Sequence, residues 1–392
     1  MSWEDPREDI DSLTPTLVEI RRDIHKHPEL GFEEVRTQRL IKGWLSQLGY
    51  TPVECARTGL IADLRPELHG QRTIALRADI DCLPMTEHTE LEWCSVHEGC
   101  AHKCGHDGHT AILLGTAAIL ARYRAQVPGN VRLVFQPAEE GVEGGGAKVM
   151  VAEGALDGVD EIYGLHNWPA YPRGELRVLA GPIMAQYHDF EITVRGRGGH
   201  GGAPEHARDP IVAGAALVTS LQSVVSRGLG GAGGAVVSVC TFEAGDTTNV
   251  IPEFARMTGT VRSFTENATE RVLSRMREIA AGIGTAYGVE IDVAFETGFP
   301  VLYNDPTCVD AVTRVADSVA GIQASSEGLP MSASEDFSYF AAEVPAAYFF
   351  LGAGREGEDT PGCHHPDFDF DDELIPVGLE MFLGLVRDRF PT

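Results

Sequence analysis

Residues 73–79 read TIALRAD, a short apolar run with turn residues nearby. Such a run is typical of a strand buried inside a sheet. Three further runs have the same character: VRLVFQP (131–137), EIYGLH (161–166) and AAYFFLG (346–352). Helical patterns lie between them, most clearly TAILLGTAAILARY (110–123). The alternation predicts an α/β fold in which helices cover both faces of a mixed sheet.

The middle of the chain has a different pattern. Its elements follow the order strand, helix, strand, strand, helix, strand, which is the ferredoxin-like arrangement. They cover 187–196, 208–227, 236–245, 254–264, 266–286 and 289–295. We therefore expect an inserted α+β domain at 183–296, within a first domain formed by 1–182 and 297–392. The glycine-rich stretch GLGGAGGA (228–235) is expected to be a flexible connection within the insert.

Composition excludes several classes of protein. The chain has 392 residues and a formal net charge of -27, and such a surface repels nucleic acids and anionic membranes. The N-terminal segment is acidic and lacks an apolar core, so no signal peptide is expected. The sequence contains no run of about 18 apolar residues, so no transmembrane helix is expected. The eight cysteines are scattered through a long chain, which favours a reducing cytoplasm over a disulfide framework.

Potential metal ligands are concentrated in HKCGHDGHTA (102–111). Cys104 and His106 stand where a loop leads into a helix, and ligands bind at that edge of an open α/β sheet. One alternative is that Cys104 is a small buried hydrophobe and that the histidines have no ligand role. A second alternative is a structural zinc site formed by Cys94, Cys100, Cys104 and His106, although this spacing matches no standard zinc motif.

Three further segments carry possible ligands. FQPAEEG (135–141) places Glu139 and Glu140 after a strand, where one can bind a metal while the other stays free to act as a general base. The alternative is a solvated acidic loop. His166 ends one strand, and His364 follows another. A mixed set of sulfur, nitrogen and oxygen ligands suits zinc, manganese or cobalt better than calcium or magnesium.

Ten ordered motifs resemble one family over nearly the whole chain. The chain is similar to the metal-dependent aminoacylases and hippurate hydrolases, a group that includes auxin-amino acid conjugate hydrolases and related carboxypeptidases. The motifs are HKHPELGFEE (25–34), LRADIDCLPM (76–85), CGHDGHTA (104–111), FQPAEEG (135–141), GLHNWP (164–169), GGHGGAPE (198–205), TTNVIP (247–252), GTVRSF (259–264), SEDFSYF (334–340) and HHPDFDFDD (364–372).

The resemblance implies a centre of two divalent metal ions. Cys104 would bridge both ions, His106 and His166 would complete one site, and Glu140 and His364 would complete the other. In the family the C-terminal histidine ligand is usually followed by Asn, Ser or Thr and then by proline. This chain has a second histidine at the middle position, in His364-His365-Pro366. Alignment on the proline selects His364, and His365 is the alternative.

The same resemblance implies roles for residues around the metals. Glu139 would be the general base, and Asp79 and Asp81 would orient ligands. His102, Asp107 and His109 are expected to orient ligands or to be structural. The domain at 1–182 and 297–392 would be catalytic, and the insert at 183–296 would be a lid and dimerisation domain.

The insert would also contribute to substrate binding. His200 would stabilise the oxyanion, in the partner subunit's site, and Asn249 and Arg262 would hold the substrate carboxylate.

The expected activity is hydrolysis of the amide bond of N-acyl amino acids, such as N-acetyl or N-benzoyl compounds, to a carboxylic acid and a free amino acid. The metals would be manganese or zinc, with cobalt or nickel as alternatives. We expect a cytoplasmic homodimer or higher homo-oligomer with a small-molecule substrate. The rival functions are a dipeptidase or carboxypeptidase with the same centre, and a non-catalytic metal-binding protein.

Overall fold

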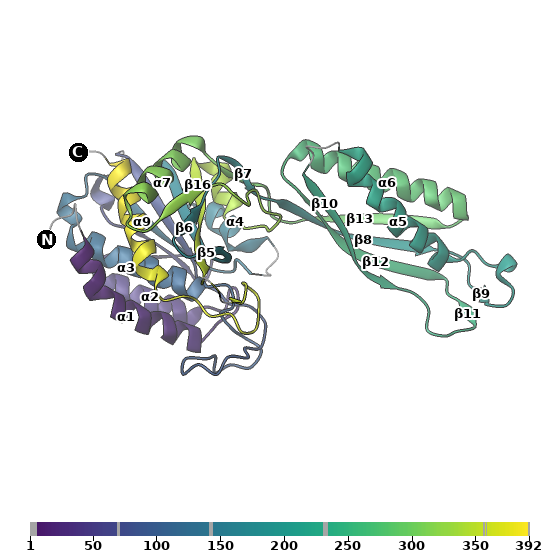
Figure 1. Cartoon of the computed structure of the whole chain (residues 1–392), viewed down its shortest axis with the longest axis horizontal. Coiled ribbons are helices and arrows are strands. Elements are labelled where there is room, and N and C mark those ends of the chain that lie inside the picture. The colour runs from purple at the N-terminus through teal and green to yellow at the C-terminus, as the bar shows by residue number, and fades with distance from the viewer. Residues whose placement is uncertain are drawn as a thin grey trace. The chain divides into compact units, whose positions relative to one another are not determined.

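The computed structural model describes residues 6–68, 71–140, 144–229, 234–355, 357 and 359–390. The chain forms two compact units (Figure 1). The first consists of Met1–Ile183, Leu302–Leu329 and Glu335–Thr392, and the second of Met184–Val301 and Pro330–Ser334. The sequence places the insert at 183–296, whereas the contacts extend the second unit to Val301 and add Pro330–Ser334.

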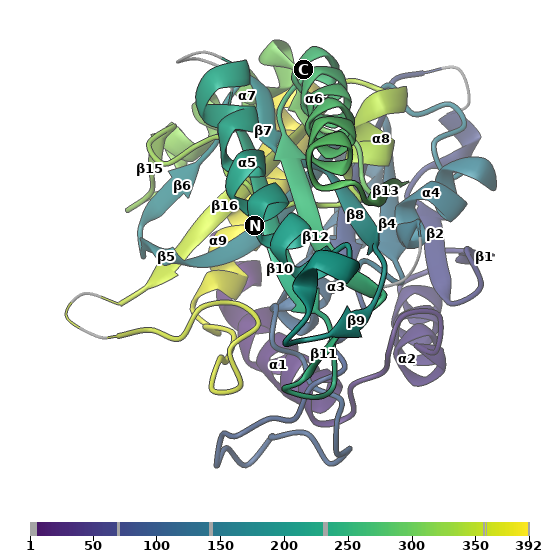
Figure 2. The ribbon, with the colours of Figure 1, turned by 90° about the vertical axis from the view of Figure 1, so that its right-hand side faces the viewer.

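The first unit is built on an eight-stranded sheet with the order β1-β2-β4-β3-β5-β16-β6-β15. Figure 2 shows this sheet spread from β15 and β6 on the left to β2 and β1 on the right. Its strands are β1 (Val53–Cys55), β2 (Gly59–Asp63), β3 (Thr73–Asp79), β4 (Asn130–Gln136), β5 (Glu161–Pro172), β6 (Glu175–Arg177), β15 (Gln323–Ser325) and β16 (Ala346–Gly354). A separate pair joins β7 (Gly181–Met184) to β14 (Leu302–Asn304).

The centre of the sheet is parallel, antiparallel pairs flank it on both sides, and the edge strand β15 runs parallel to β6. Strand β3 runs parallel to β4 and to β5, and β16 runs parallel to β5. Strands β1, β2 and β4 pair in antiparallel fashion, as do β16 and β6. The predicted mixed sheet is therefore confirmed. Because four neighbouring strands run the same way, their carboxyl ends meet at one edge, where α/β proteins bind ligands.

Alternation along β3 separates the two faces of this sheet. Ile74, Leu76 and Ala78 join the large apolar core, which also contains side chains of α1 (Arg7–Lys26), α3 (His106–Arg122) and α9 (Leu374–Arg389). Arg77 points to the opposite face, where it contacts Glu335 and Asp336 just before α8 (Ser338–Glu343).

Shorter elements complete the first unit. They are α2 (Val35–Gln47), α4 (Gly145–Ala152), α7 (Pro306–Ser318) and the short 3-10 helices η1 (Pro66–Leu68) and η2 (Arg124–Gln126). Strand β5 continues six residues beyond the predicted end at His166, because β16 pairs with it as far as Pro172. Helix α3 begins four residues before the predicted start at Thr110, so His106 is its first residue.

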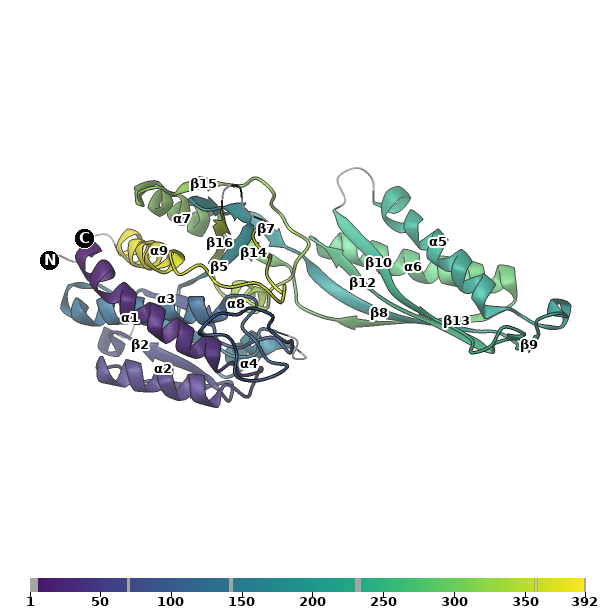
Figure 3. The same ribbon diagram turned by 60° about the horizontal axis from the view of Figure 1, so that its bottom comes forward.

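The second unit has the predicted ferredoxin-like topology. Its four-stranded antiparallel sheet has the order β10-β12-β8-β13, and α5 and α6 lie on one face of it (Figure 3). The elements are β8 (Gln186–Arg195), β9 (Gly199–His200), η3 (Pro204–His206), α5 (Pro210–Gly228), β10 (Ala235–Glu243), β11 (Val250–Ile251), β12 (Phe254–Ser263), α6 (Glu266–Tyr287) and β13 (Glu290–Thr297). Residues 230–233 of the predicted glycine-rich loop lie outside the described residues.

Local signals at the helix ends explain where α5 and α6 begin. The Asp209 side chain accepts hydrogen bonds from the backbone N–H groups of Ile211 and Val212, and Pro210 occupies the first turn of α5. The Thr265 hydroxyl accepts from the N–H of Ala268 at the start of α6. Gly288 ends α6 in the left-handed conformation, with φ 67°.

Helix α5 is long and apolar enough to span a membrane by length and composition, and it is the only such helix among the described residues. Ala213, Leu217, Leu221 and Val224 of this helix are buried in the core of the second unit.

Arg77 neutralises buried negative charge on one face of the first sheet. Its side chain is 1% exposed and contacts three carboxylates. We expect Arg77→Met to lower the free energy of unfolding by about 3–5 kcal/mol, because it leaves buried carboxylates without their counter-charge. No tryptophan lies in the second unit, and the first contains Trp44, Trp93 and Trp168 among its described residues, so tryptophan fluorescence during urea unfolding reports on the first unit.

The control for this variant is Arg314→Met. Arg314 pairs with Asp388 at 2.7 Å, but its side chain is 54% exposed. Loss of such a surface pair changes stability by about 0.5 kcal/mol or less. Equal losses in the two variants would contradict a structural role for the buried charge.

Candidate metal centre

The candidate ligands converge at the carboxyl edge of the parallel strands. Strand β3 ends at Asp79, and the segment Pro137–Glu140 follows β4. His166 lies in β5, and Cys104 precedes the first turn of α3. Four separate segments of the first unit thus place ligand-type side chains at one edge, as the strand-end pattern predicts.

Gly105 permits the turn that separates Cys104 from His106. This residue caps α3 in the left-handed conformation, with φ 106°. A Cβ atom here would lie 2.0 Å from Oδ1 of Asn167, so no other residue fits without moving Asn167. The Cys-Gly-His order therefore lets the chain reverse sharply while both flanking side chains stay at the sheet edge.

Cys104, His106 and His166 form the first ligand group. Their ligand atoms all lie within 4.8 Å of one another, and all three residues are buried. The Sγ atom of Cys104 is 3.3 Å from Nε2 of His166. Nδ1 of His166 lies 2.6 Å from the carbonyl oxygen of Asn167, and donation there leaves Nε2 with its lone pair free to bind a metal.

Cys104, Glu140 and His364 form the second group, again with ligand atoms within 4.8 Å. Nε2 of His364 lies 3.1 Å from Oε1 of Glu140. His364 adopts a left-handed conformation, with φ 67°, and its backbone N–H donates to the carbonyl of Lys103. His365 instead turns toward Asp367, 3.8 Å away, and does not join any of the ligand groups formed by the described residues.

Cys104 belongs to both groups, so its thiol lies where it can contact two ions. The fit to a metal is clearest at His106, because its Nε2 is buried and has no hydrogen-bond partner. Carboxylate oxygens of Asp79, Glu139 and Glu140 lie 3.7–4.0 Å from this nitrogen, too far for hydrogen bonds. A buried lone pair facing carboxylates and a thiol is the environment that a divalent cation satisfies.

Asp81 holds both ligand segments in place. One carboxylate oxygen lies 3.2 Å from Nδ1 of His106, and the other accepts the backbone N–H of Glu140 at 2.8 Å. His109 is held between Asp79, 2.7 Å from Nδ1, and Asn167, 2.7 Å from Nε2. These contacts agree with the orienting roles expected for Asp79, Asp81 and His109.

The contacts of Asp107 and the burial of His102 support a structural role for these two residues. Asp107 accepts from Nδ1 of His25 at 2.8 Å and lies 3.1 Å from Nε of Arg21. Burial lowers the pKa of His102 to about 3. His102 is therefore a neutral packed ring at neutral pH.

Glu139 and Glu140 differ in environment although they are adjacent. From the protein groups alone, burial and then the charge of Glu335 hold the pKa of Glu139 well above its usual range. Burial also opposes ionisation of Glu140, but His364 and His106 outweigh it and lower the pKa of that carboxyl group. Both side chains are 9% exposed, so the solvated-loop alternative is wrong for this pair.

The local structural-zinc alternative also lacks support. Among the described residues, Cys94 and Cys100 join no group of three metal-ligand side chains. The sulfur of Cys100 lies instead 2.9 Å from that of Cys82. The ligand groups that contain Cys104 take their other members from distant parts of the sequence.

The remaining predicted site residues, His200, Asn249 and Arg262, lie at different places in the second unit. His200 in β9 pairs with Val250 in β11, and the N–H of Gly201 donates to the carbonyl of Asn249. These residues precede β12, whereas Arg262 lies near its far end. A strand rises about 3.3 Å per residue, so the eight steps from Phe254 to Arg262 span roughly 26 Å.

Asn249 and Arg262 of one chain therefore cannot hold the same substrate carboxylate, so their shared role stays a prediction that requires the two residues to come from different chains. Arg262 instead donates to Oγ of Ser334 at 2.6 Å and stacks over the Tyr187 ring at 4.7 Å.

Sequence reasoning assigned no role to several residues that support the site. Glu34 accepts the N–H of Ala138 at 2.9 Å, and Ala138 has a left-handed φ of 52° immediately before Glu139. Arg77 binds Asp79, and Glu335 lies within 4.8 Å of Glu139. All of these except Ala138 have charged side chains inside strongly patterned motifs, which is the signal that could have identified them.

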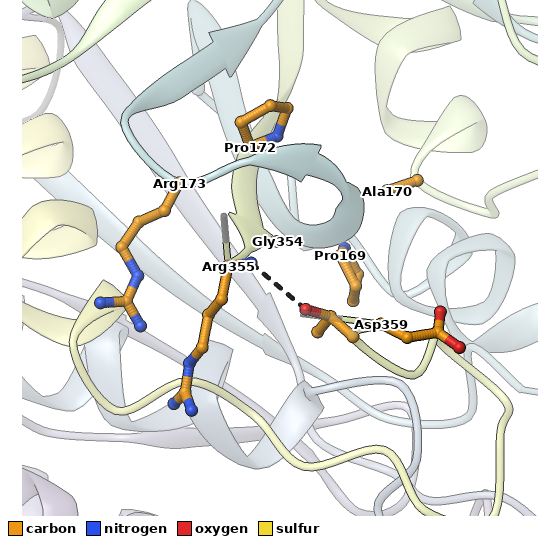
Figure 4. Close-up of a pocket in the computed structure, with 8 residues that line it drawn as sticks. Pro169, Ala170, Pro172, Arg173, Gly354, Arg355 and Asp359 are labelled. Atoms are coloured by element: carbon orange, nitrogen blue, oxygen red, sulfur yellow. Dashed lines mark hydrogen bonds between the residues drawn. The ribbon is translucent and has the colours of Figure 1, made fainter. Parts of the chain in front are cut away.

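A separate cavity of about 880 Å³ is lined in part by the carboxyl-terminal ends of β5 and β16 (Figure 4). Its lining includes Arg173, Arg355, Asp359 and Thr360, and the N–H of Arg355 donates to the Thr360 hydroxyl. Arg173 pairs with Asp371 and Glu373. None of the predicted site residues lines this cavity.

Comparison with known proteins places these features in a family. The chain matches peptidase family M20/M25/M40 over residues 75–388. It is 41% identical to the N-acetylcysteine deacetylase of Bacillus subtilis (strain 168), over 94% of this chain and 95% of that protein. It is 36% identical to thermostable carboxypeptidase 1 of Saccharolobus solfataricus, over 95% of each chain.

A solved structure agrees with both sequence relatives. A Bacillus subtilis protein described as a dinuclear metal binding peptidase from the M20 family superposes with a TM-score of 0.83 and 36% identity, covering 96% of this chain and 98% of that one. The resemblance identified from the ten motifs is confirmed, and this chain belongs to peptidase family M20/M25/M40.

Proposed function

We propose that this protein hydrolyses the amide bond of N-acyl amino acids and releases a carboxylic acid and a free amino acid. The observation that carries the proposal is a pair of ligand groups that share Cys104 beside the buried carboxyl group of Glu139. The deacetylase relative acts on a compound of this class, which supports the same reaction type.

The proposed centre would hold two divalent ions, and Cys104 belongs to both of the ligand groups that would bind them. His106 and His166 would hold one ion, and Glu140 and His364 would hold the other. Thiolate, imidazole and carboxylate ligands favour manganese or zinc, with cobalt or nickel as alternatives. When bound, such ions polarise the scissile carbonyl and make a nearby water a better nucleophile at neutral pH.

Glu139 is the proposed general base. One carboxylate oxygen takes a proton from the attacking water and then delivers it to the nitrogen of the leaving amine. Asp81 orients His106 and the Glu140 backbone, so it keeps the ligands around this base.

We propose that the second unit is a lid and dimerisation domain, as expected for 183–296, and that the protein is a homodimer. Nδ1 of His200 accepts the N–H of Gly202, so the neutral ring carries its proton on Nε2. That proton can stabilise an oxyanion in the partner subunit's site.

The separation of Asn249 from Arg262 along β12 supports a site to which both subunits contribute residues. Arg262 binds the substrate carboxylate in one site, and the partner subunit's Asn249 approaches the same substrate together with the partner subunit's His200. Arg262 already holds Ser334 and Tyr187 close by, which fixes the direction of its guanidinium group.

Carboxypeptidase activity is the second candidate function, because the relative from Saccharolobus solfataricus carries that name. A peptide with a free C-terminal carboxylate is itself an N-acyl amino acid, so the same centre could act on both classes. A non-catalytic metal-binding protein is disfavoured, since Glu139 and all the proposed ligands are present and gathered. We place the protein in the cytoplasm, with a small-molecule substrate and without nucleic-acid or membrane partners.

The two adjacent glutamates give the sharpest test of the centre. Glu139→Gln should keep both metal ions but lower kcat by about 10²–10⁴-fold, because only proton transfer is lost. Glu140→Gln should lose metal, and excess metal in the assay should restore part of its activity. Metal content and kcat are measured on the same preparations of both variants. Loss of metal from Glu139→Gln together with full content in Glu140→Gln would reverse the two roles.

A substrate panel tests recognition of the carboxylate. N-acetyl and N-benzoyl amino acids, dipeptides and the corresponding C-terminal amides are compared with manganese, zinc, cobalt and nickel. Conversion of the substrate carboxylate to an amide should lower kcat/KM at least about tenfold, since a charged partner of Arg262 is lost. Equal rates on acids and amides would refute this role for Arg262, and preference for dipeptides would favour the peptidase alternative.

Mixing of inactive variants tests the contribution of the partner subunit. If His200 acts in the partner subunit's site, random mixing of His200→Ala with Glu139→Gln makes half of the dimers mixed, with one complete site in each. Activity should then recover to about a quarter of the wild-type value. The control mixes Cys104→Ser with Glu139→Gln, which creates no complete site. Failure to recover, with subunit exchange demonstrated by tagged chains, would place His200 in its own chain's site.

A further inference from the structure

Cys82 and Cys100 bring two sulfur atoms together next to the metal centre. Their Sγ atoms lie 2.9 Å apart, and both side chains are thiols. A disulfide bond requires about 2.05 Å, so the sulfurs need to approach by less than 1 Å. Cys82 lies within the motif LRADIDCLPM (76–85), but the proposed hydrolysis uses neither cysteine.

The backbone explains why the two thiols meet. Leu83 and Ala101 form an isolated antiparallel bridge, and each N–H donates to the other's carbonyl at 3.1 Å. Cys82 and Cys100 each precede one of these bridged residues in sequence. Residues 84–99 form a long excursion between the two ends of the bridge, so the cysteines stand at its base.

The two thiols differ in access. Cys82 is 2% exposed, and its backbone N–H donates to the carbonyl of Glu29. Cys100 is partly exposed, and its sulfur lies 3.5 Å from the carbonyl of Pro28. A reagent from solution therefore reaches Cys100 first. The buried Cys82 is the resolving thiol, which displaces the reagent from Cys100.

We propose that Cys82 and Cys100 are a reversible disulfide site that reacts with low-molecular-weight disulfides such as oxidised glutathione. The Cys100 thiolate attacks the reagent, forms a mixed disulfide and releases one thiol. The Cys82 thiolate then attacks Sγ of Cys100, forms the protein disulfide and releases the second thiol. The two cysteines lose two protons and two electrons, and the reagent is reduced to two thiols.

The bond would join the two segments that support the metal ligands. Cys82 follows Asp81, which contacts His106 and accepts the N–H of Glu140. Cys100 lies four residues before Cys104. A covalent link at the base of the excursion restricts local opening of both segments, and release of a buried ion requires such opening. Oxidation should therefore slow metal release. This second effect rests on the proposed metal centre, whereas bond formation does not.

Peptide mapping tests the bond directly. The holoenzyme is incubated with oxidised glutathione, alkylated under denaturing conditions, and cleaved with trypsin and then after glutamate. The cleavage sites put Cys82 in 78–87, Cys94 in 93–98 and Cys100 in 99–103. We expect a linked pair of 78–87 and 99–103 that separates on reduction. Cys82→Ser should instead retain glutathione on Cys100, because the resolving thiol is gone.

Cys94→Ser is the matched control, since it removes a thiol from the same excursion but should leave the bond intact. A stable glutathione adduct on Cys100 of the wild type, no reaction at Cys100, or a linkage of Cys104 to Cys363 in place of the expected pair would each overturn the assignment. Cys363 is the relevant competitor because its sulfur lies 3.6 Å from the carbonyl oxygen of Cys104.

Transfer of Zn²⁺ to a colorimetric chelator tests the consequence. Release from the oxidised wild type should be several-fold slower than from the reduced protein, and the difference should vanish in Cys82→Ser and Cys100→Ser. Equal release rates with the bond formed would refute the stabilising role. A protein that forms the bond but holds no zinc or manganese would refute the proposed metal centre and leave the disulfide assignment standing.

Discussion

The guanidinium group of Arg77 balances a concentration of buried negative charge at the edge of the first sheet. It lies 2.7 Å from Asp79, 2.9 Å from Glu335 and 3.4 Å from Asp336. Asp81 and Glu139 are buried at the same edge, so the carboxyl groups outnumber this single arginine. Desolvation makes such an excess costly unless protons or further cations compensate it. The raised pKa values of Glu139 and Asp336 express this imbalance, and bound divalent cations would relieve it.

The backbone near the centre is held in conformations that ordinary residues adopt rarely. Ala138 and His364 both have left-handed φ values, and each adjoins or supplies a residue of the proposed site. Neighbouring contacts over-determine these conformations, since Glu34 holds the N–H of Ala138 and the carbonyl of Lys103 holds that of His364. Positions of the side chains therefore depend on several remote segments at once.

Much of this arrangement was predictable from strand ends. Runs such as TIALRAD and EIYGLH indicated buried strands, with His166 at the end of one, and the Cys104 segment was predicted to lie where a loop leads into a helix at the ligand-binding edge. Arg77 was not predictable, because its partners Glu335 and Asp336 follow it by more than 250 residues. The separation of Asn249 from Arg262 also required the register and length of β12, which motif order does not reveal. Helix α3 began earlier than predicted, since the left-handed turn at Gly105 depends on packing against Asn167.

The metal-ligand groups lie wholly within the first unit, whereas His200, Asn249 and Arg262 belong to the second. The two sets of residues are thus carried by separate compact units, each with an apolar core of its own. Substitutions at His200, Asn249 or Arg262 can therefore occur without a change in the charge balance around Arg77. Such modularity gives a physical route by which changes can accumulate in one unit while the ligand groups of the other stay intact.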